Sequence, residues 1–117
     1  MEWCSINWGD YSNPLWTAHN LYIDNQLITD LVVPDGVSYI GRNAFDRCSC
    51  LNSITIPNSV KTINERAFWY CTNLTSINFD GTKVEWQAIS KGEEWHNQVP
   101  SNCVVHCIGE DIKIANA

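Results

Sequence analysis

The residues best suited to chemistry in this 117-residue chain are its six cysteines and three histidines. Cys103, His106 and Cys107 combine thiolate and imidazole groups, which zinc accepts as tetrahedral ligands. On a strand, however, Cys103 and Cys107 would lie roughly 13 Å apart, because each residue advances the chain by about 3.3 Å. One ion cannot bridge that distance, so the spacing favours buried thiols in a closing strand. We expect neither a metal site nor a cofactor.

A cysteine with a histidine is also the minimum for a thiol hydrolase. His19 and His106 fall near opposite ends of the chain, and no third group is visible to orient either ring. A nucleophile and its base need such an orienting partner. The sequence therefore predicts a protein that is not an enzyme.

Two of the cysteines belong to a pattern that organises the chain, because two stretches of sequence repeat at an offset of 23 residues. The recurring apolar positions are Val37, Ile40, Ala44, Phe45 and Cys48, which return as Val60, Ile63, Ala67, Phe68 and Cys71. A third copy starts at Leu74 and leaves the pattern at Asp80-Gly81. A fixed period of this size predicts a solenoid whose units stack. Cys48 and Cys71 then fill a small apolar slot as buried thiols, although the spacing of neighbouring coils does not forbid a bridge between them.

We expect one domain over residues 1–117, an α/β solenoid of about two and a half 23-residue coils. Its parts are an N-terminal cap (1–27), two repeats (28–50 and 51–73), a partial third repeat (74–81) and a C-terminal cap (82–117). The terminal units must differ from the repeats, because an uncapped end would expose the apolar interior and an open strand edge. Five of the six tryptophans lie outside the repeats, which predicts aromatic-rich caps.

Each repeat has a simple predicted layout. Residues 51–56 alternate apolar with small polar side chains, which indicates a short strand with Ile54 and Ile56 pointing inward. Val60 and Ile63 supply a second inward pair, and residues 67–71 are predicted to form one helical or 3₁₀ turn. Stacked copies of the strand would form a narrow parallel sheet.

The caps carry local signals of their own. Residues 21–28 predict a hairpin with its turn at Asp24-Asn25, and residues 13–20 predict a short helix after Pro14. Residues 82–89 predict a second helix, with Thr82 as its cap and Glu85 three residues later. Residues 102–108 predict a last strand.

The outward side chains of the predicted sheet form the candidate protein-binding face, because solenoids use this face for contact. They stand in two rows, Asp30, Ser53 and Ser76 in one and Val32, Thr55 and Asn78 in the other. Trp69, next to Tyr70 in the outer turn, is an additional candidate. An ordinary solvated sheet face is the alternative interpretation, since the rows hold none of the Tyr, Trp, Met and Arg residues that interface cores favour.

Composition limits the partners. Seven Lys and Arg residues against thirteen Asp and Glu residues give a net charge of −6, which excludes the basic face needed for nucleic acid. No apolar run is long enough to insert into a membrane, and the start Met1-Glu2-Trp3 lacks the basic residues and apolar run of a signal peptide.

The repeat L-x-S-I-T-I-P-N-S-V-K-T-I-x-x-x-A-F-x-x-C-T-N at residues 51–73 resembles that of the BspA-like leucine-rich repeat proteins, a family of bacterial and protist surface proteins. The resemblance extends into the flanks, at Asn13-Pro-Leu and at Ala88-Ile89-Ser-Lys91-Gly92. It implies a right-handed leucine-rich solenoid, displayed outside the cell, that binds host or microbial proteins. Because an array generally needs about three repeats to be stable, much of the stability of this short array must come from the caps or from self-association.

The resulting hypothesis is a non-enzymatic protein-binding or adhesion module, at the cell surface or secreted as part of a longer protein. One alternative is a small acidic cytoplasmic protein that blocks a basic, nucleic-acid-handling enzyme by charge complementarity. A weaker alternative is a carbohydrate-binding module that uses Trp69.

Overall fold

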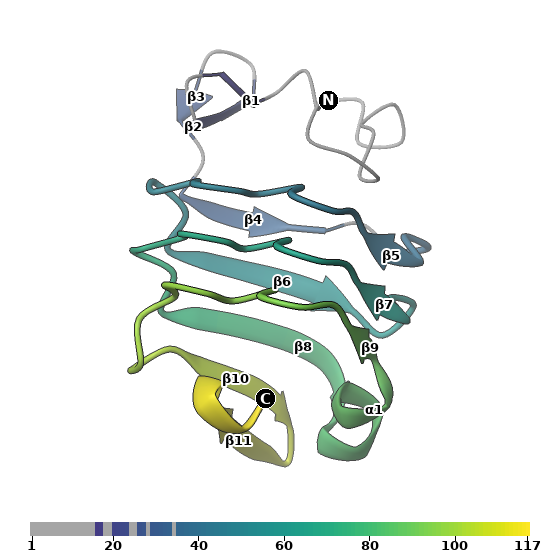
Figure 1. Ribbon diagram of the computed structural model, residues 1–117. Helices are drawn as coiled ribbons and strands as arrows, with labels where there is room; N and C mark the ends of the chain where they lie inside the picture. Colours follow the sequence, from purple (N-terminus) through teal and green to yellow (C-terminus); the bar gives the residue numbers. More distant parts are fainter. Residues whose placement is uncertain (1–15, 18–19, 24–25, 28, 34) are drawn as a thin grey trace.

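The computed structural model describes residues 16–17, 20–23, 26–27, 29–33 and 35–117. The strands are β1 (Trp16–Thr17), β2 (Asn20–Ile23), β3 (Gln26–Leu27), β4 (Asp30–Val32), β5 (Tyr39–Ile40), β6 (Ser53–Pro57), β7 (Thr62–Ile63), β8 (Ser76–Thr82), β9 (Ser90–Lys91), β10 (Val104–Ile108) and β11 (Glu110–Lys113). One α-helix, α1 (Lys83–Ala88), separates β8 from β9, and a 3₁₀ turn, Ile114–Asn116, follows β11. Figure 1 shows the strands of successive units stacked one below the next.

The principal sheet has the strand order β11-β10-β8-β6-β4, in which β4, β6, β8 and β10 run parallel. Leu31 pairs with Ile54, and Ile54 pairs with Ile77, so the register advances by the 23 residues of the sequence repeat. The inward side chains of this sheet are almost fully buried, including Ile54 and Ile56. The predicted parallel strands are therefore confirmed.

A second sheet, β5-β7-β9, takes one short parallel strand from each unit. Val60 and Ile63, the predicted second inward pair, are fully buried there. The chain then crosses back along three stretches that we call the return segments (41–50, 64–73 and 92–103), which lie in front of the principal sheet in Figure 1. The hydrophobic core lies between the principal sheet and these segments.

The return segments contain separate hydrogen-bonded turns where one helical or 3₁₀ turn was predicted at 67–71. Within 64–73, the N–H groups of Ala67, Trp69 and Cys71 each donate to the carbonyl three residues earlier. Arg66 and Tyr70 adopt left-handed backbone angles, with φ of 57° and 60°. A left-handed residue interrupts a right-handed helix, so these bonds close separate turns. Four other N–H groups of this segment donate to neighbouring units, as that of Phe68 does to the carbonyl of Trp95.

Aromatic rings run through the core. Phe45 stacks on Phe68 at 5.5 Å between ring centroids, and Phe68 meets the edge of Trp95. Trp95 contacts Trp86, which contacts Phe79. The expected packing role of Trp86 and Trp95 is thus confirmed, since these rings are 0% and 6% exposed. Trp3 and Trp8 lie outside the described residues.

The N-terminal strands form a small antiparallel sheet, β1-β2-β3. The predicted hairpin is present, because β2 pairs with β3 from Ile23 opposite Gln26. The predicted helix over 13–20 is wrong at Trp16 and Thr17, which form β1 and pair with β2. The helix prediction used only the signal after Pro14, whereas antiparallel pairing with Asn20 and Leu21 of β2 provides the backbone of Trp16 and Thr17 with strand partners instead. The rest of the predicted helix start, 13–15, and the turn at 24–25 lie outside the described residues.

The C-terminal part, 82–117, continues both parallel sheets. The predicted helix is confirmed as α1, where Thr82 accepts a bond from the Glu85 N–H and the Glu85 carboxylate accepts one from the Thr82 N–H. After α1, β9 pairs with β7 and β10 pairs with β8. Antiparallel β11 then covers the outer edge of β10. This segment, assigned to a cap from the sequence, therefore contains strands of the stacked units as well as a closing strand.

Candidate functional site

The strand register brings six of the seven predicted contact residues together on one surface. Asp30 lies beside Ser53, which lies beside Ser76. In the second row Val32 lies beside Thr55, which lies beside Asn78. All six alternate along their strands with fully buried residues and point away from the core. We call this outward surface of β4, β6, β8 and β10 the sheet face.

The sheet face is wider than the sequence indicated. Val104 pairs with Ser76 and His106 pairs with Asn78, so β10 adds one residue to each row. His106, which lies in the range assigned to the C-terminal cap from the sequence, is exposed, with its Nδ1 atom 2.9 Å from Oδ1 of Asp111. The period-two alternation at residues 104–106 could be recognised in the sequence. The pairing of β10 with β8 could not.

Hydrogen bonds link side chains along this surface. The Ser53 hydroxyl donates to Oδ1 of Asp30 at 2.7 Å, across the β4–β6 boundary. The Ser76 hydroxyl donates to Oδ1 of Asn78 at 3.4 Å, a weaker contact within β8. The polar rows therefore already have internal partners, which restrains their rotamers before any partner binds.

A groove of about 400 Å³ lies on the sheet face where the strands end. Its lining residues are Val32, Val33, Asp35, Thr55, Pro57, Asn78, Phe79 and Asp80. Val32 is 60% exposed, the largest apolar exposure on β4. Sequence analysis identified Val32, Thr55 and Asn78 but missed Asp35 and Asp80. The signal for Asp80 was its place two residues beyond Asn78, on the same side of β8.

Trp69 does not belong to the sheet face. It lies on a return segment, next to Ala67 and Phe68, whose buried side chains are part of the core that separates this segment from β6. The guanidinium carbons of Arg47 and Arg66 lie over its ring, 5.2 and 5.3 Å from the centroid. The indole also packs against Tyr70 at 4.3 Å.

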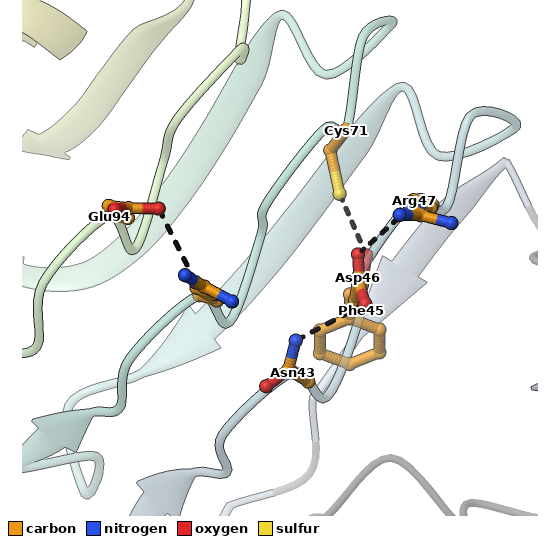
Figure 2. A network of polar contacts seen from close by, with 7 residues as sticks. Asn43, Phe45, Asp46, Arg47, Cys71 and Glu94 are labelled. Carbon is orange, nitrogen blue, oxygen red and sulfur yellow. Dashed lines mark hydrogen bonds and ion pairs between the residues drawn. The ribbon is translucent and has the colours of Figure 1, made fainter.

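Ion pairs order the arginines around Trp69. Arg47 lies 3.8 Å from the carboxylate of Asp46, and Arg66 lies 3.3 Å from that of Glu94 on the next return segment. Figure 2 shows these pairs, with Asn43 donating to Asp46. Because Arg47 and Arg66 each pair with a carboxylate, their charges interact mainly with residues of this protein.

The cysteines support structure in the described part of the chain. Cys48 and Cys71 are fully buried free thiols, as predicted, and Cys71 donates to the carbonyl of Phe45 at 3.0 Å. Burial raises the pKa of Cys71 to about 12 and that of Cys103 to about 11, and it raises the pKa of Cys48 well above its usual range. These thiols stay protonated at neutral pH and are poor nucleophiles.

The Cys103-x-x-His106-Cys107 motif is divided between two sides of β10. Cys103 is fully buried, whereas His106 faces solvent on the sheet face. Over the described residues, no three Cys, His, Asp or Glu side chains gather closely enough to hold a metal ion. Among these same residues, no helix has the length and apolar character to cross a bilayer.

Residues 18–92 match the family described as BspA type leucine-rich repeat region, with six copies. The chain belongs to this family. The BspA-type resemblance found at residues 51–73 is thereby confirmed. No curated protein matches the chain.

One solved structure with a similar fold is that of a leucine-rich cell surface protein from Faecalibacterium prausnitzii A2-165. It is 40% identical to this BspA-type chain over the matched region, with a TM-score of 0.53. The match covers 54% of this chain and 17% of that protein. The matched region is thus less than a fifth of the length of that surface protein.

Proposed function

We propose that this chain is a non-enzymatic protein-binding module of a bacterial cell surface, and that the sheet face makes the contact. The observation that carries the proposal is the alignment of outward side chains from β4, β6, β8 and β10 in a family of leucine-rich repeats. Adhesion to host or microbial proteins is the specific form of the proposal. The cell surface description of the similar protein from F. prausnitzii supports this location.

At the level of architecture the proposal is a right-handed solenoid closed by caps at both ends. The constant 23-residue register between β4, β6 and β8 supports a regular coil. The antiparallel strand β11 supports a cap at the C-terminal end, because it covers the edge of β10 that a further parallel strand would otherwise occupy.

The contacts of Trp69 weaken the carbohydrate-binding alternative. A sugar ring would need the apolar surface of the indole for stacking. Arg47 and Arg66 already lie over that ring, so a sugar would have to displace guanidinium groups that are also held by carboxylates.

The test is a binding assay with the full chain against a panel of extracellular-matrix proteins and bacterial surface proteins, in parallel with basic cytosolic proteins. The variant Thr55→Arg/Ser76→Arg places two long side chains on the sheet face. The matched control Thr72→Arg/Gln87→Arg adds the same charge at exposed positions outside it.

We expect affinity for a surface or matrix protein to fall at least about tenfold in the sheet-face variant and less than about twofold in the control. Circular dichroism should show that both variants remain folded. Equal affinities for the two variants would contradict a role for the sheet face. Exclusive binding to basic cytosolic proteins would instead support the cytoplasmic alternative.

A further inference from the structure

We infer that the groove on the sheet face accepts a lysine or arginine side chain from a cationic segment of the partner protein. This inference rests on the proposed function, because it specifies the chemistry of the partner for the same surface. It depends on the placement of carboxylates, on their lack of ion-pair partners in the described part of the chain, and on the exposed apolar side chain of Val32 beside them.

The carboxylates lie on two sides of the groove. Asp35 follows β4, whereas Asp80 belongs to β8. Strand β6 runs between them and contributes the uncharged residues Thr55 and Pro57. Neighbouring strands are about 4.8 Å apart, so β4 and β8 lie roughly 10 Å apart. An ammonium or guanidinium group between these strands would be within about 5–6 Å of both sides.

The negative charge at the groove is not compensated by the protein itself. In the described part of the chain, ion pairs join Arg47 to Asp46, Arg66 to Glu94, Lys83 to Glu110 and His106 to Asp111. None of these involves Asp35 or Asp80, or Asp30 on the adjacent row. With a net charge of −6 for the whole chain, the field at this surface favours a cation.

The apolar lining favours a long side chain over a small ion. Val32 is 60% exposed and provides the apolar surface of the groove, whereas Val33 and Phe79 line it with only 2% and 4% of their surface exposed. The methylene stem of lysine or arginine packs on such a surface while its charged head reaches polar groups. A metal ion fits less well, since the described residues provide no cluster of three ligating side chains. The occupant that satisfies both features is therefore a basic side chain.

The test is an NMR titration of the ¹⁵N-labelled full chain with a nine-residue peptide of alternating lysine and threonine. The same peptide with glutamate in place of lysine is the ligand control. The variant Asp35→Asn/Asp80→Asn removes both carboxylates without changing side-chain size. The matched variant Glu93→Gln/Glu94→Gln makes the same change in net charge on a return segment.

We expect the lysine peptide to shift the amide signals of Val32, Thr55 and Asn78, with binding about threefold to tenfold weaker in Asp35→Asn/Asp80→Asn, since each exposed charge pair contributes modestly. The Glu93→Gln/Glu94→Gln variant should bind like the unchanged protein. Raising the salt from 50 to 500 mM should weaken binding, because the carboxylates are solvent-accessible.

Equal weakening in both variants, equal binding of the glutamate peptide, absence of lysine-peptide binding, or shifts confined to the return segments would each overturn the inference. The proposed function has a separate readout, the loss of surface-protein binding in Thr55→Arg/Ser76→Arg. A chain that binds a surface protein through the sheet face yet ignores the lysine peptide would disprove only the cationic partner.

Discussion

At the scale of single residues, burial determines the chemistry of the cysteines. The thiolate is the reactive species, and the pKa of Cys103, about 11, lies two units above the ordinary value of 9.0. At pH 8 the native thiolate fraction is therefore lower by about 100-fold. The pKa of Cys71, about 12, reduces its thiolate fraction further.

We predict that iodoacetamide at pH 8 alkylates Cys71 and Cys103 at least about 100-fold more slowly in the native protein than in guanidinium chloride. Half-buried Cys50 provides an internal comparison and should react faster. Peptide mapping by mass spectrometry measures each site. Native labelling of Cys71 at the unfolded rate would show that this part of the core is open.

The same shifts predict how stability depends on pH. In the unfolded chain these thiols ionise near pH 9.0, earlier than in the native protein. Raised native pKa values therefore leave stability intact below pH 9 and reduce it as the pH rises from 9 toward 12. Denaturant titrations at pH 8 and pH 10.5 should show a lower midpoint at the higher pH.

At the scale of elements, close contact between neighbouring units limits which residues fit. The Gly92 N–H donates to the carbonyl of Ile63, and a Cβ atom at Gly92 would overlap the backbone nitrogen of Glu65. The contact is backbone against backbone, so no flexible side chain can move aside. Glycine at this position lets β9 join the second sheet.

We predict that Gly92→Ala lowers the free energy of unfolding by about 1–3 kcal/mol, the usual cost of overpacking. Ser90→Ala, at an exposed position of the strand β9 that ends just before Gly92, is the control and should change stability by less than about 0.5 kcal/mol. Urea unfolding followed by tryptophan fluorescence measures both. Similar midpoints for the two variants would show that β9 can shift without cost.

At the scale of the whole molecule, the antiparallel strand β11 follows the run of parallel strands at one end of the principal sheet. It covers the edge of β10, and Ile112 and Ile114 extend the core, being 5% and 2% exposed. Without it, a parallel sheet would end in unpaired N–H and C=O groups, which recruit strands from other chains. Self-association of the intact protein, suggested by its few repeats, remains a prediction.

We predict that truncation after Gly109 makes the protein associate or unfold, whereas truncation after Ile114 leaves it folded with its oligomeric state unchanged. The second truncation retains β11 and both buried isoleucines. Size-exclusion chromatography with light scattering distinguishes the two results. A truncation after Gly109 that stays folded and keeps the mass of the intact protein would argue against the closing role of β11.

Much of this arrangement could be predicted from the chain. Leu31, Ile54 and Ile77 share an apolar slot at a 23-residue offset, and a repeated apolar pattern can be buried only by stacking equivalent positions. Thr82 and Glu85 indicated the helix that follows β8, because a capping box depends only on residues three apart. The rows of the sheet face followed from the same offset.

Other features depended on contacts between distant residues. The extension of the sheet face to His106 and the groove between Asp35 and Asp80 both require pairings between distant strands that no local pattern encodes. The strand at Trp16–Thr17 pairs with the nearby residues 20–21, but the signal after Pro14 favoured a helix there. After Gly81 the sequence no longer follows the repeat, so it did not indicate that β9 pairs with β7 and β10 pairs with β8. A repeat can be recognised in a sequence because the same apolar positions recur in each unit. Strand partners outside the repeats and the walls of a groove are decided only when the chain packs in three dimensions.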